Sequence, residues 1–115
     1  MIPHILFYTD WIKEGRGGVT NAFVIRLRPK YKDDEGIYQH ELVHVKQWWR
    51  TLSFTSFLYL LSKRYRLKAE VEAYRKQLEY NPGNLIKYAT WLSDPSSKTG
   101  YGLNVSREEV IRLLA

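Results

Sequence analysis

The segment His40-Glu41-Leu42-Val43-His44 is an HExxH motif, in a chain of 115 residues that contains only three histidines. On a helix, residues four apart lie on one face, so the rings of His40 and His44 can reach the same metal ion. The carboxylate of Glu41 projects at a neighbouring angle, where it can contact a water bound to that metal. The motif therefore supplies two zinc ligands and a general base.

The residues around the motif favour a helix over residues 34–50. Asp33, Asp34 and Glu35 precede the motif, where acidic side chains cap a helix and complement its dipole. Between Ile37 and Arg50 there is no proline or glycine to interrupt it. The alternative is a surface helix that carries two histidines at this spacing by chance.

A zinc site that performs catalysis needs a third protein ligand and an open position for water. Thiolate ligands are excluded because the chain has no cysteine, and the remaining histidine, His4, is distant in sequence. The third ligand is therefore expected to be an aspartate or glutamate. A second helix is predicted over about residues 63–80, because within residues 66–78 apolar residues at helical spacing define one buried stripe: Leu67, Val71, Tyr74 and Leu78.

Two glutamates of this second helix are candidates. Glu70 lies at the edge of the buried stripe, roughly 75° from its centre, whereas Glu72 lies roughly 125° from the centre among charged residues. Glu72 can form an i,i+4 pair with Lys76, which suits a solvated face. A ligand has to point inward, so Glu70 is the predicted ligand. The alternatives are Glu72 as the ligand and a boundary Glu70 without a metal.

With these two helices in place, the chain resembles the gluzincin zinc metallopeptidases. In that family, two histidines of HExxH and a glutamate on a later helix bind zinc. The matching residues here are His40, His44 and Glu70, the last from Glu70-Val71-Glu72-Ala73. The resemblance implies that Zn²⁺ is the cofactor and that Glu41 is the catalytic base. Order and spacing are also similar to small single-domain metallopeptidase-like proteins of phages and bacteria, over roughly residues 20–80.

The chain departs from the gluzincin pattern at two points. Many members carry an aspartate four residues after the ligand glutamate, where it orients a ligand histidine, and this chain has Tyr74 at that position. The large second domain that is usual in the family is missing from the 115 residues. We therefore expect a shallow or incomplete substrate cleft.

The length predicts a single domain over residues 1–115. The order of the predicted elements indicates an α+β fold, in which a small N-terminal antiparallel sheet or hairpin precedes a helical bundle. The bundle carries the motif helix and the helix of Glu70, as in a minimal zincin-like core. Residues 4–8 are predicted to form a short buried strand, and the glycines of residues 10–20 predict a loop.

Residues 22–28 are predicted to form a strand directly upstream of the motif helix, with alternate side chains on one face: Phe23, Ile25 and Leu27. In HExxH peptidases a strand at this place often borders the cleft and pairs with extended substrate. The resemblance implies that role for residues 22–28, through main-chain pairing. The alternative is an ordinary strand that covers the core.

The remaining elements follow from turn and capping signals. Asn84 is the predicted N-cap of a third helix that ends near Leu92, and Ser106 opens a last short helix with a capping box. The polar residues 93–104 between them predict a loop that can act as a flap over the site. Gln47 lies in line with the two histidines and is a candidate donor that orients them.

The predicted function is that of a zinc-dependent metallopeptidase, which hydrolyses a peptide or protein substrate with a metal-activated water and Glu41 as general base. The oxyanion that forms needs a further hydrogen-bond donor. Tyr74, four residues after Glu70, is the preferred candidate, and Tyr38 and Tyr88 are alternatives. Zn²⁺ is the expected cofactor.

Two other functions stay open: a catalytically inactive zinc-binding interaction module of the same fold, and a basic domain associated with membranes or nucleic acid. The net charge of +6 admits polyanions, but no nucleic-acid-binding signature is present, so no specific nucleic acid is expected. The apolar residues 52–61 are too short to span a bilayer. A buried connector is favoured there over contact with a membrane surface. The chain lacks a signal peptide pattern, which predicts a cytoplasmic protein.

Overall fold

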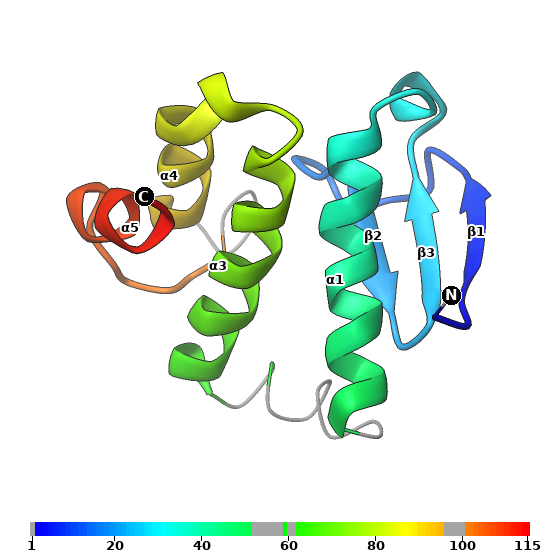
Figure 1. Ribbon diagram of the computed structural model, residues 1–115, viewed down its shortest axis with the longest axis horizontal. Coiled ribbons are helices and arrows are strands. Elements are labelled where there is room, and N and C mark those ends of the chain that lie inside the picture. Colours follow the sequence, from blue (N-terminus) through cyan, green and yellow to red (C-terminus); the bar gives the residue numbers. More distant parts are fainter. Residues whose placement is uncertain (1, 52–58, 60–61, 96–100) are drawn as a thin grey trace.

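The computed structural model describes residues 2–51, 59, 62–95 and 101–115. In this part of the chain, a small N-terminal sheet of three strands precedes four α-helices, which confirms the predicted α+β class (Figure 1). The strands are β1 (Ile5–Tyr8), β2 (Gly18–Asn21) and β3 (Val24–Leu27). The helices are α1 (Glu35–Thr51), α3 (Lys63–Leu78), α4 (Leu85–Ser93) and α5 (Arg107–Leu114), with short 3₁₀ turns η1 (Pro29–Tyr31) and η2 (Pro82–Asn84).

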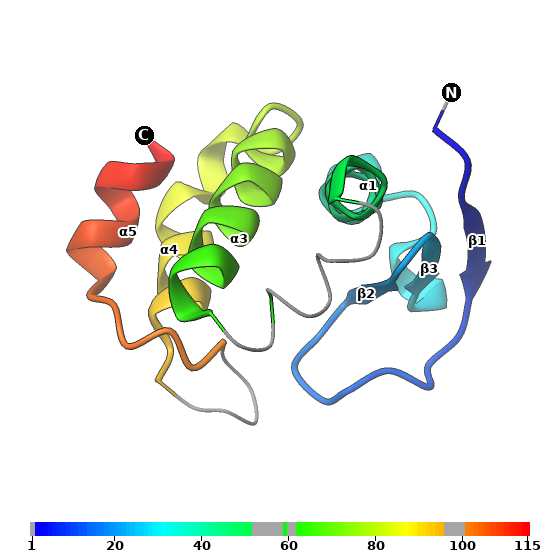
Figure 2. The same cartoon turned by 90° about the horizontal axis from the view of Figure 1, so that it is seen from below.

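The elements form successive layers, from the sheet through α1 and α3 to the pair α4 and α5 (Figure 2). One core lies between the sheet and α1 and contains Ile25, Leu27 and Val45. A second core lies where α3 meets α4 and α5, with buried residues that include Tyr74, Tyr88, Leu92, Val110 and Leu114. Helix α3 therefore has neighbours on two sides, and its side toward α1 carries the small residues Ala69 and Ala73, both buried.

The strand order is β1-β3-β2. Strands β2 and β3 form an antiparallel hairpin, whereas β1 adds to the other side of β3 in parallel. The sheet is therefore mixed, and the two strands predicted from the sequence, residues 4–8 and 22–28, pair in parallel and not in the predicted antiparallel manner. The buried face of β3 is as predicted, because Ile25 and Leu27 are completely covered. The predicted pairing of residues 22–28 with substrate is wrong, because β3 is the central strand and both of its edges are occupied by β1 and β2.

Strand β2 lies within residues predicted as a loop. The glycines there allow a strand to approach its neighbours closely. A Cβ atom on Gly18 would lie 2.5 Å from Cδ2 of Leu27 and 3.4 Å from Cγ of Glu41. A larger residue would therefore have to displace the buried side chain of Leu27 on the neighbouring strand β3. Strand β2, and not β3, is an edge strand of the described sheet, and it packs against α1.

The helix ends follow the capping signals in part. Oδ1 of Asp34 accepts the amide hydrogen of Ile37 at 3.1 Å, and Oγ of Ser106 accepts that of Glu109 at 3.1 Å. Asn84 precedes α4, but its side chain does not cap the helix and donates to the hydroxyl of Tyr88 at 3.3 Å instead. None of the helices in the described residues combines the length and apolar character needed to cross a membrane.

Candidate metal centre

The packing of α1 against α3 brings His40, His44 and Glu70 together. His40 and Glu70 are each only 3% exposed. Oε1 of Glu70 lies 3.3 Å from Nε2 of His40 and 3.2 Å from Nε2 of His44. One potential ligand atom from each of these residues lies within 4.8 Å of the others, so this cluster could hold a metal ion.

The distances within the cluster suit a small tetrahedral ion. Two ligand atoms that each lie about 2.0–2.1 Å from such an ion, at the tetrahedral angle, are about 3.3 Å apart. The two distances from Glu70 to the histidines match this separation. Both imidazole nitrogens face the same carboxylate oxygen of Glu70.

The cluster is also electrostatically suited to a cation. Burial alone would lower the pKa of His44, but the carboxylate of Glu70 and the hydrogen bonds to Glu70 and Gln47 raise it to about 10. Burial alone would raise the pKa of Glu70, yet the two histidines hold it well below its usual range. The ionised carboxylate of Glu70 therefore needs a positive partner in this buried position. Without a metal, a protonated histidine is the positive partner of this carboxylate. A metal ion that bound to the histidines would displace the proton.

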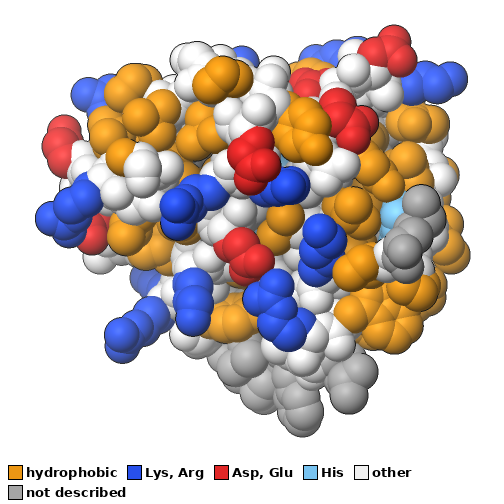
Figure 3. All heavy atoms as spheres, viewed as in Figure 1, with side chains coloured by type: hydrophobic (Ala, Val, Ile, Leu, Met, Phe, Trp, Pro, Cys, Tyr) orange, Lys and Arg blue, Asp and Glu red, His pale blue; other side chains and the backbone are white. Residues whose placement is uncertain are grey.

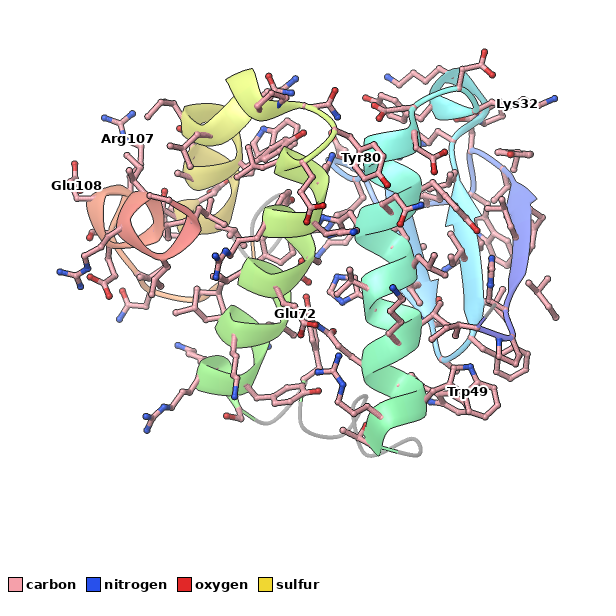
Figure 4. All side chains as sticks on the ribbon, in the orientation of Figure 1. Lys32, Trp49, Glu72, Tyr80, Arg107 and Glu108 are labelled. Atoms are coloured by element: carbon pink, nitrogen blue, oxygen red, sulfur yellow. The ribbon has the colours of Figure 1, made fainter. Side chains whose placement is uncertain are left out.

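Glu72 does not join the cluster. Its side chain is 44% exposed and forms an ion pair with Arg50 of α1 at 3.1 Å, between the two helices as Figure 4 shows. It also accepts a hydrogen bond from Nε2 of Gln47 at 3.0 Å. The expected pair between Glu72 and Lys76 is absent from the described ion pairs, since Lys76 contacts Glu79 at 3.3 Å. Of the two candidate glutamates, Glu70 is the one that lies beside the histidines.

Gln47 fixes the orientation of His44. Its Nε2 donates to the carbonyl of Ala69 at 3.0 Å, which turns its Oε1 toward Nδ1 of His44 at 2.9 Å. An amide oxygen can only accept, so Nδ1 carries the proton and Nε2 is left free to bind a metal when the ring is neutral. Gln47 thus lies where the sequence predicted, but it acts on the histidine as an acceptor and not as a donor.

Gln47→Leu is expected to weaken metal binding by about 10- to 100-fold, because the tautomer and angle of His44 are no longer set. Gln47→Glu keeps an acceptor for Nδ1 but loses the donor to Ala69 and Glu72, so its affinity should fall between those of the wild type and Gln47→Leu. Competition with a chromophoric chelator measures both variants, and Gln39→Leu, elsewhere on α1, serves as the control. Equal affinities for Gln47→Leu and Gln47→Glu would show that the hydrogen bond to His44 does not matter.

His40 is oriented by packing. Among the described residues, no hydrogen-bond partner reaches its buried Nδ1. The ring of Tyr74 meets the ring of His40 edge to face, with centroids 4.3 Å apart at 75°. Tyr74 therefore contacts His40 from the position where many gluzincins have an aspartate. Its hydroxyl pairs with that of Tyr101 at 2.7 Å.

Glu41 is held against the cluster by Thr20 of β2. The hydroxyl of Thr20 donates to Oε1 of Glu41 at 2.8 Å, and it also lies 3.1 Å from the carbonyl oxygen of Glu41. Oε2 of Glu41 is 3.9 Å from Nε2 of His40. One carboxylate oxygen is thus anchored while the other faces the metal cluster. The sequence interpretation missed Thr20, although the β-branched pair Val19-Thr20 after the glycines is a strand signal.

Tyr59 contacts the cluster from the other side. Its hydroxyl donates to Oε2 of Glu70, so Oε1 is the oxygen left for the histidines. Burial, reinforced by the charge of Glu70, raises the pKa of Tyr59 well above its usual value, so this group is a donor and not an anion. Tyr59 belongs to the predicted connector 52–61, whose other residues lie outside the described part of the chain. No local sequence pattern points to this role.

Two clefts lined by described residues meet at the cluster. The larger, of about 470 Å³, reaches from the β1–β2 connection and η1 to α4. The smaller, of about 320 Å³, follows β2 and includes His44 and Glu70. Arg16, Gly18, His40, Glu41 and Tyr101 line both.

The tyrosine candidates differ in their access to these clefts. Tyr74 lines the larger cleft, as does Tyr88. Tyr38 lines neither, and its hydroxyl pairs with Nε2 of His4 at 2.8 Å. Tyr101, which belongs to the predicted flap 93–104, lines both clefts, while residues 96–100 of that segment lie outside the described residues. The sequence interpretation did not single out Tyr101 or Arg16, because each reaches the site from an irregular segment.

The chain matches no protein-family model, no curated protein and no solved structure. The likeness to gluzincins therefore stays a prediction from the residues of the HExxH motif and from Glu70. Function has to be inferred from the cluster formed by His40, His44 and Glu70, with Glu41 beside it.

Proposed function

We propose that the protein is a zinc-dependent peptidase that uses Glu41 as its general base. One observation carries the proposal: Oε1 of Glu70 lies 3.2–3.3 Å from Nε2 of both motif histidines, and the anchored carboxylate of Glu41 lies beside them. Three potential ligands and the proposed base thus lie at the junction of two clefts, which supports the proposal.

The donor set favours zinc. Two imidazoles and one carboxylate form the ligand set of many catalytic zinc sites, in which a fourth position is left for water. When bound, the ion supplies Lewis acidity that lowers the pKa of a water and polarises the substrate carbonyl. Glu41 takes a proton from the attacking water and passes it to the leaving amine. The hydrogen bond from Thr20 holds Glu41 in position for both transfers.

The Tyr74–Tyr101 pair supplies the hydrogen bond to the developing oxyanion, with Tyr101 facing both clefts and Tyr74 bound to its hydroxyl. The guanidinium of Arg16 lies 3.9 Å from the centre of the Tyr101 ring and adds positive charge at the same place. Burial keeps the pKa of both tyrosines above their usual value, so both hydroxyls are protonated at neutral pH.

Extended substrate is proposed to pair with β2. This strand ends the described sheet and lines the smaller cleft beside the base. Main-chain groups on its outer side suit β-augmentation, which selects weakly for sequence. The role that the family resemblance implied for residues 22–28 is thereby transferred to Gly18–Asn21.

The proposal predicts one zinc per chain and metal-dependent hydrolysis. Elemental analysis after mild chelation and reloading measures the zinc, and a pool of quenched fluorescent peptides measures hydrolysis. Activity should disappear with the chelator and return with zinc. His4→Ala, outside the cluster, should keep both properties, and Tyr101→Phe should lower kcat about 100-fold with its zinc retained. Zinc without turnover would indicate the inactive binding module, and a wild-type protein without zinc would contradict the proposal.

A further inference from the structure

The larger cleft carries basic side chains on walls formed by different parts of the chain. Lys30 lies in η1, between β3 and α1, and Lys87 lies on α4. Arg16 lies where this cleft joins the smaller one, at the metal cluster. A peptide that extended from the cluster along the larger cleft would therefore meet a lining that includes these cations.

The two lysines differ from basic residues elsewhere on the surface. On the face shown in Figure 3, acidic side chains lie among the basic ones, and ion pairs such as Arg50–Glu72 and Lys76–Glu79 are formed. Nζ of Lys30 instead lies 5.1 Å from the centre of the Tyr31 ring, and Nζ of Lys87 lies 5.0 Å from that of Trp91. Among the described residues, neither lysine forms an ion pair with a carboxylate. A cation over a ring keeps its charge and can still meet an anion.

The acidic residues of the cleft are outnumbered by its cations, with Glu14, Asp34 and Glu41 against Arg16, Arg28, Lys30 and Lys87. Asp34 caps α1, and Glu41 is anchored by Thr20 as the proposed base. Arg28 also lines the cleft, but its guanidinium is engaged by main-chain oxygens of the β1–β2 connection. Lys30 and Lys87 therefore stay available to a bound anion.

From this arrangement we infer that the larger cleft selects peptides with Asp or Glu side chains close to the scissile bond. The inference rests on the proposed peptidase function, since it describes the substrate of the same site. Carboxylates within about 8–10 Å of the lysines would feel their charge at physiological salt. Acidic peptides would bind more tightly than neutral ones of the same length, and basic peptides would bind least.

Binding of labelled peptides tests the inference without relying on turnover. Zinc-loaded Glu41→Gln protein is titrated, by fluorescence anisotropy, into three pools of fluorescein-labelled, C-terminally amidated octapeptides. The pools share a neutral random composition and differ at two fixed positions, which are Glu, Gln or Lys. The Glu pool is expected to bind about fivefold to tenfold more tightly than the Gln pool at low salt, as a few partly exposed ion pairs allow. The difference should shrink as salt is added.

Charge-reversal variants distinguish the effect of the lysines in the cleft from the effect of the overall net charge of +6. The double variant Lys30→Glu/Lys87→Glu should lose the preference for the Glu pool. Lys63→Glu/Lys68→Glu makes the same change in net charge on α3, away from both clefts, and should keep it. Thermal melts of both variants confirm that these exposed substitutions leave the fold intact.

Two results would overturn the inference: equal affinity of the Glu and Gln pools for the Glu41→Gln protein, or an equal loss of preference in the Lys63/Lys68 control. The first would show that the cleft does not sense acidic side chains, and the second that only net charge matters. Failure of the peptidase proposal is a separate result. It would appear as absent zinc-dependent hydrolysis by the wild type, with or without the binding preference.

Discussion

Glu41→Gln is expected to lower kcat for peptide hydrolysis by about 10²- to 10⁴-fold, the range over which a positioned general base contributes to catalysis. The substituted amide has the same shape, and its oxygen can still accept the hydrogen bond from Thr20. It cannot accept a proton from water. The loss should therefore fall on kcat, while zinc content and melting temperature stay close to those of the wild type.

The matched control for this variant is Glu35→Gln. Glu35 lies in the first turn of the same helix and accepts a hydrogen bond from Gln39 at 2.8 Å, outside both clefts. Steady-state kinetics on one peptide and elemental analysis on the same preparations give the comparison. Wild-type turnover by Glu41→Gln would mean that another group is the base. Loss of zinc together with turnover would mean that Glu41 holds the metal and is not a general base.

The proposed chemistry depends on the carboxylate of Glu41, which is held by the hydrogen bond from Thr20. Glu41 could be identified from the sequence, but Thr20 could not. Helical periodicity alone places His40, Glu41 and His44, because spacing along one helix fixes relative direction. It also favours Glu70 over Glu72, since direction around a second helix separates an inward from an outward side chain. Thr20 was missed because its strand follows glycines, and those glycines are required for close approach to α1, which is a tertiary property.

The tyrosines illustrate the same limit. Tyr74 could be placed near the ligands because it follows Glu70 by one helical turn. Tyr59 and Tyr101 reach the cluster from segments without regular periodicity, so no local pattern points to them. The sheet order is a comparable case. Residues 22–28 were recognised as a strand, but a strand sequence does not reveal which of its edges are occupied.

Glu70→Ala is expected to weaken zinc binding by more than about 100-fold, since it removes a ligand and not only a group that orients one. Glu72→Ala should lower the zinc affinity by less than about tenfold, because in the described part of the chain Glu72 contacts the site through Gln47 and not directly. Zinc content after mild chelation and reloading compares the two variants. Retention of zinc by Glu70→Ala, with its loss from Glu72→Ala, would identify Glu72 as the ligand and contradict the assignment made here.

Loss of stability in Glu70→Ala has to be distinguished from loss of zinc binding, because the substitution also removes the acceptor for the hydroxyl of Tyr59. A buried polar group left without a partner costs about 1–3 kcal/mol. Glu70→Gln fills the space and keeps an acceptor, but its neutral amide is a much weaker zinc ligand than the carboxylate.

Zinc at 100 times its Kd should stabilise the wild type by about 2.7 kcal/mol. The same zinc should leave the melting temperature of Glu70→Gln nearly unchanged. Because binding and stability are linked, this shift reports occupancy of the site whether or not a substrate has been found.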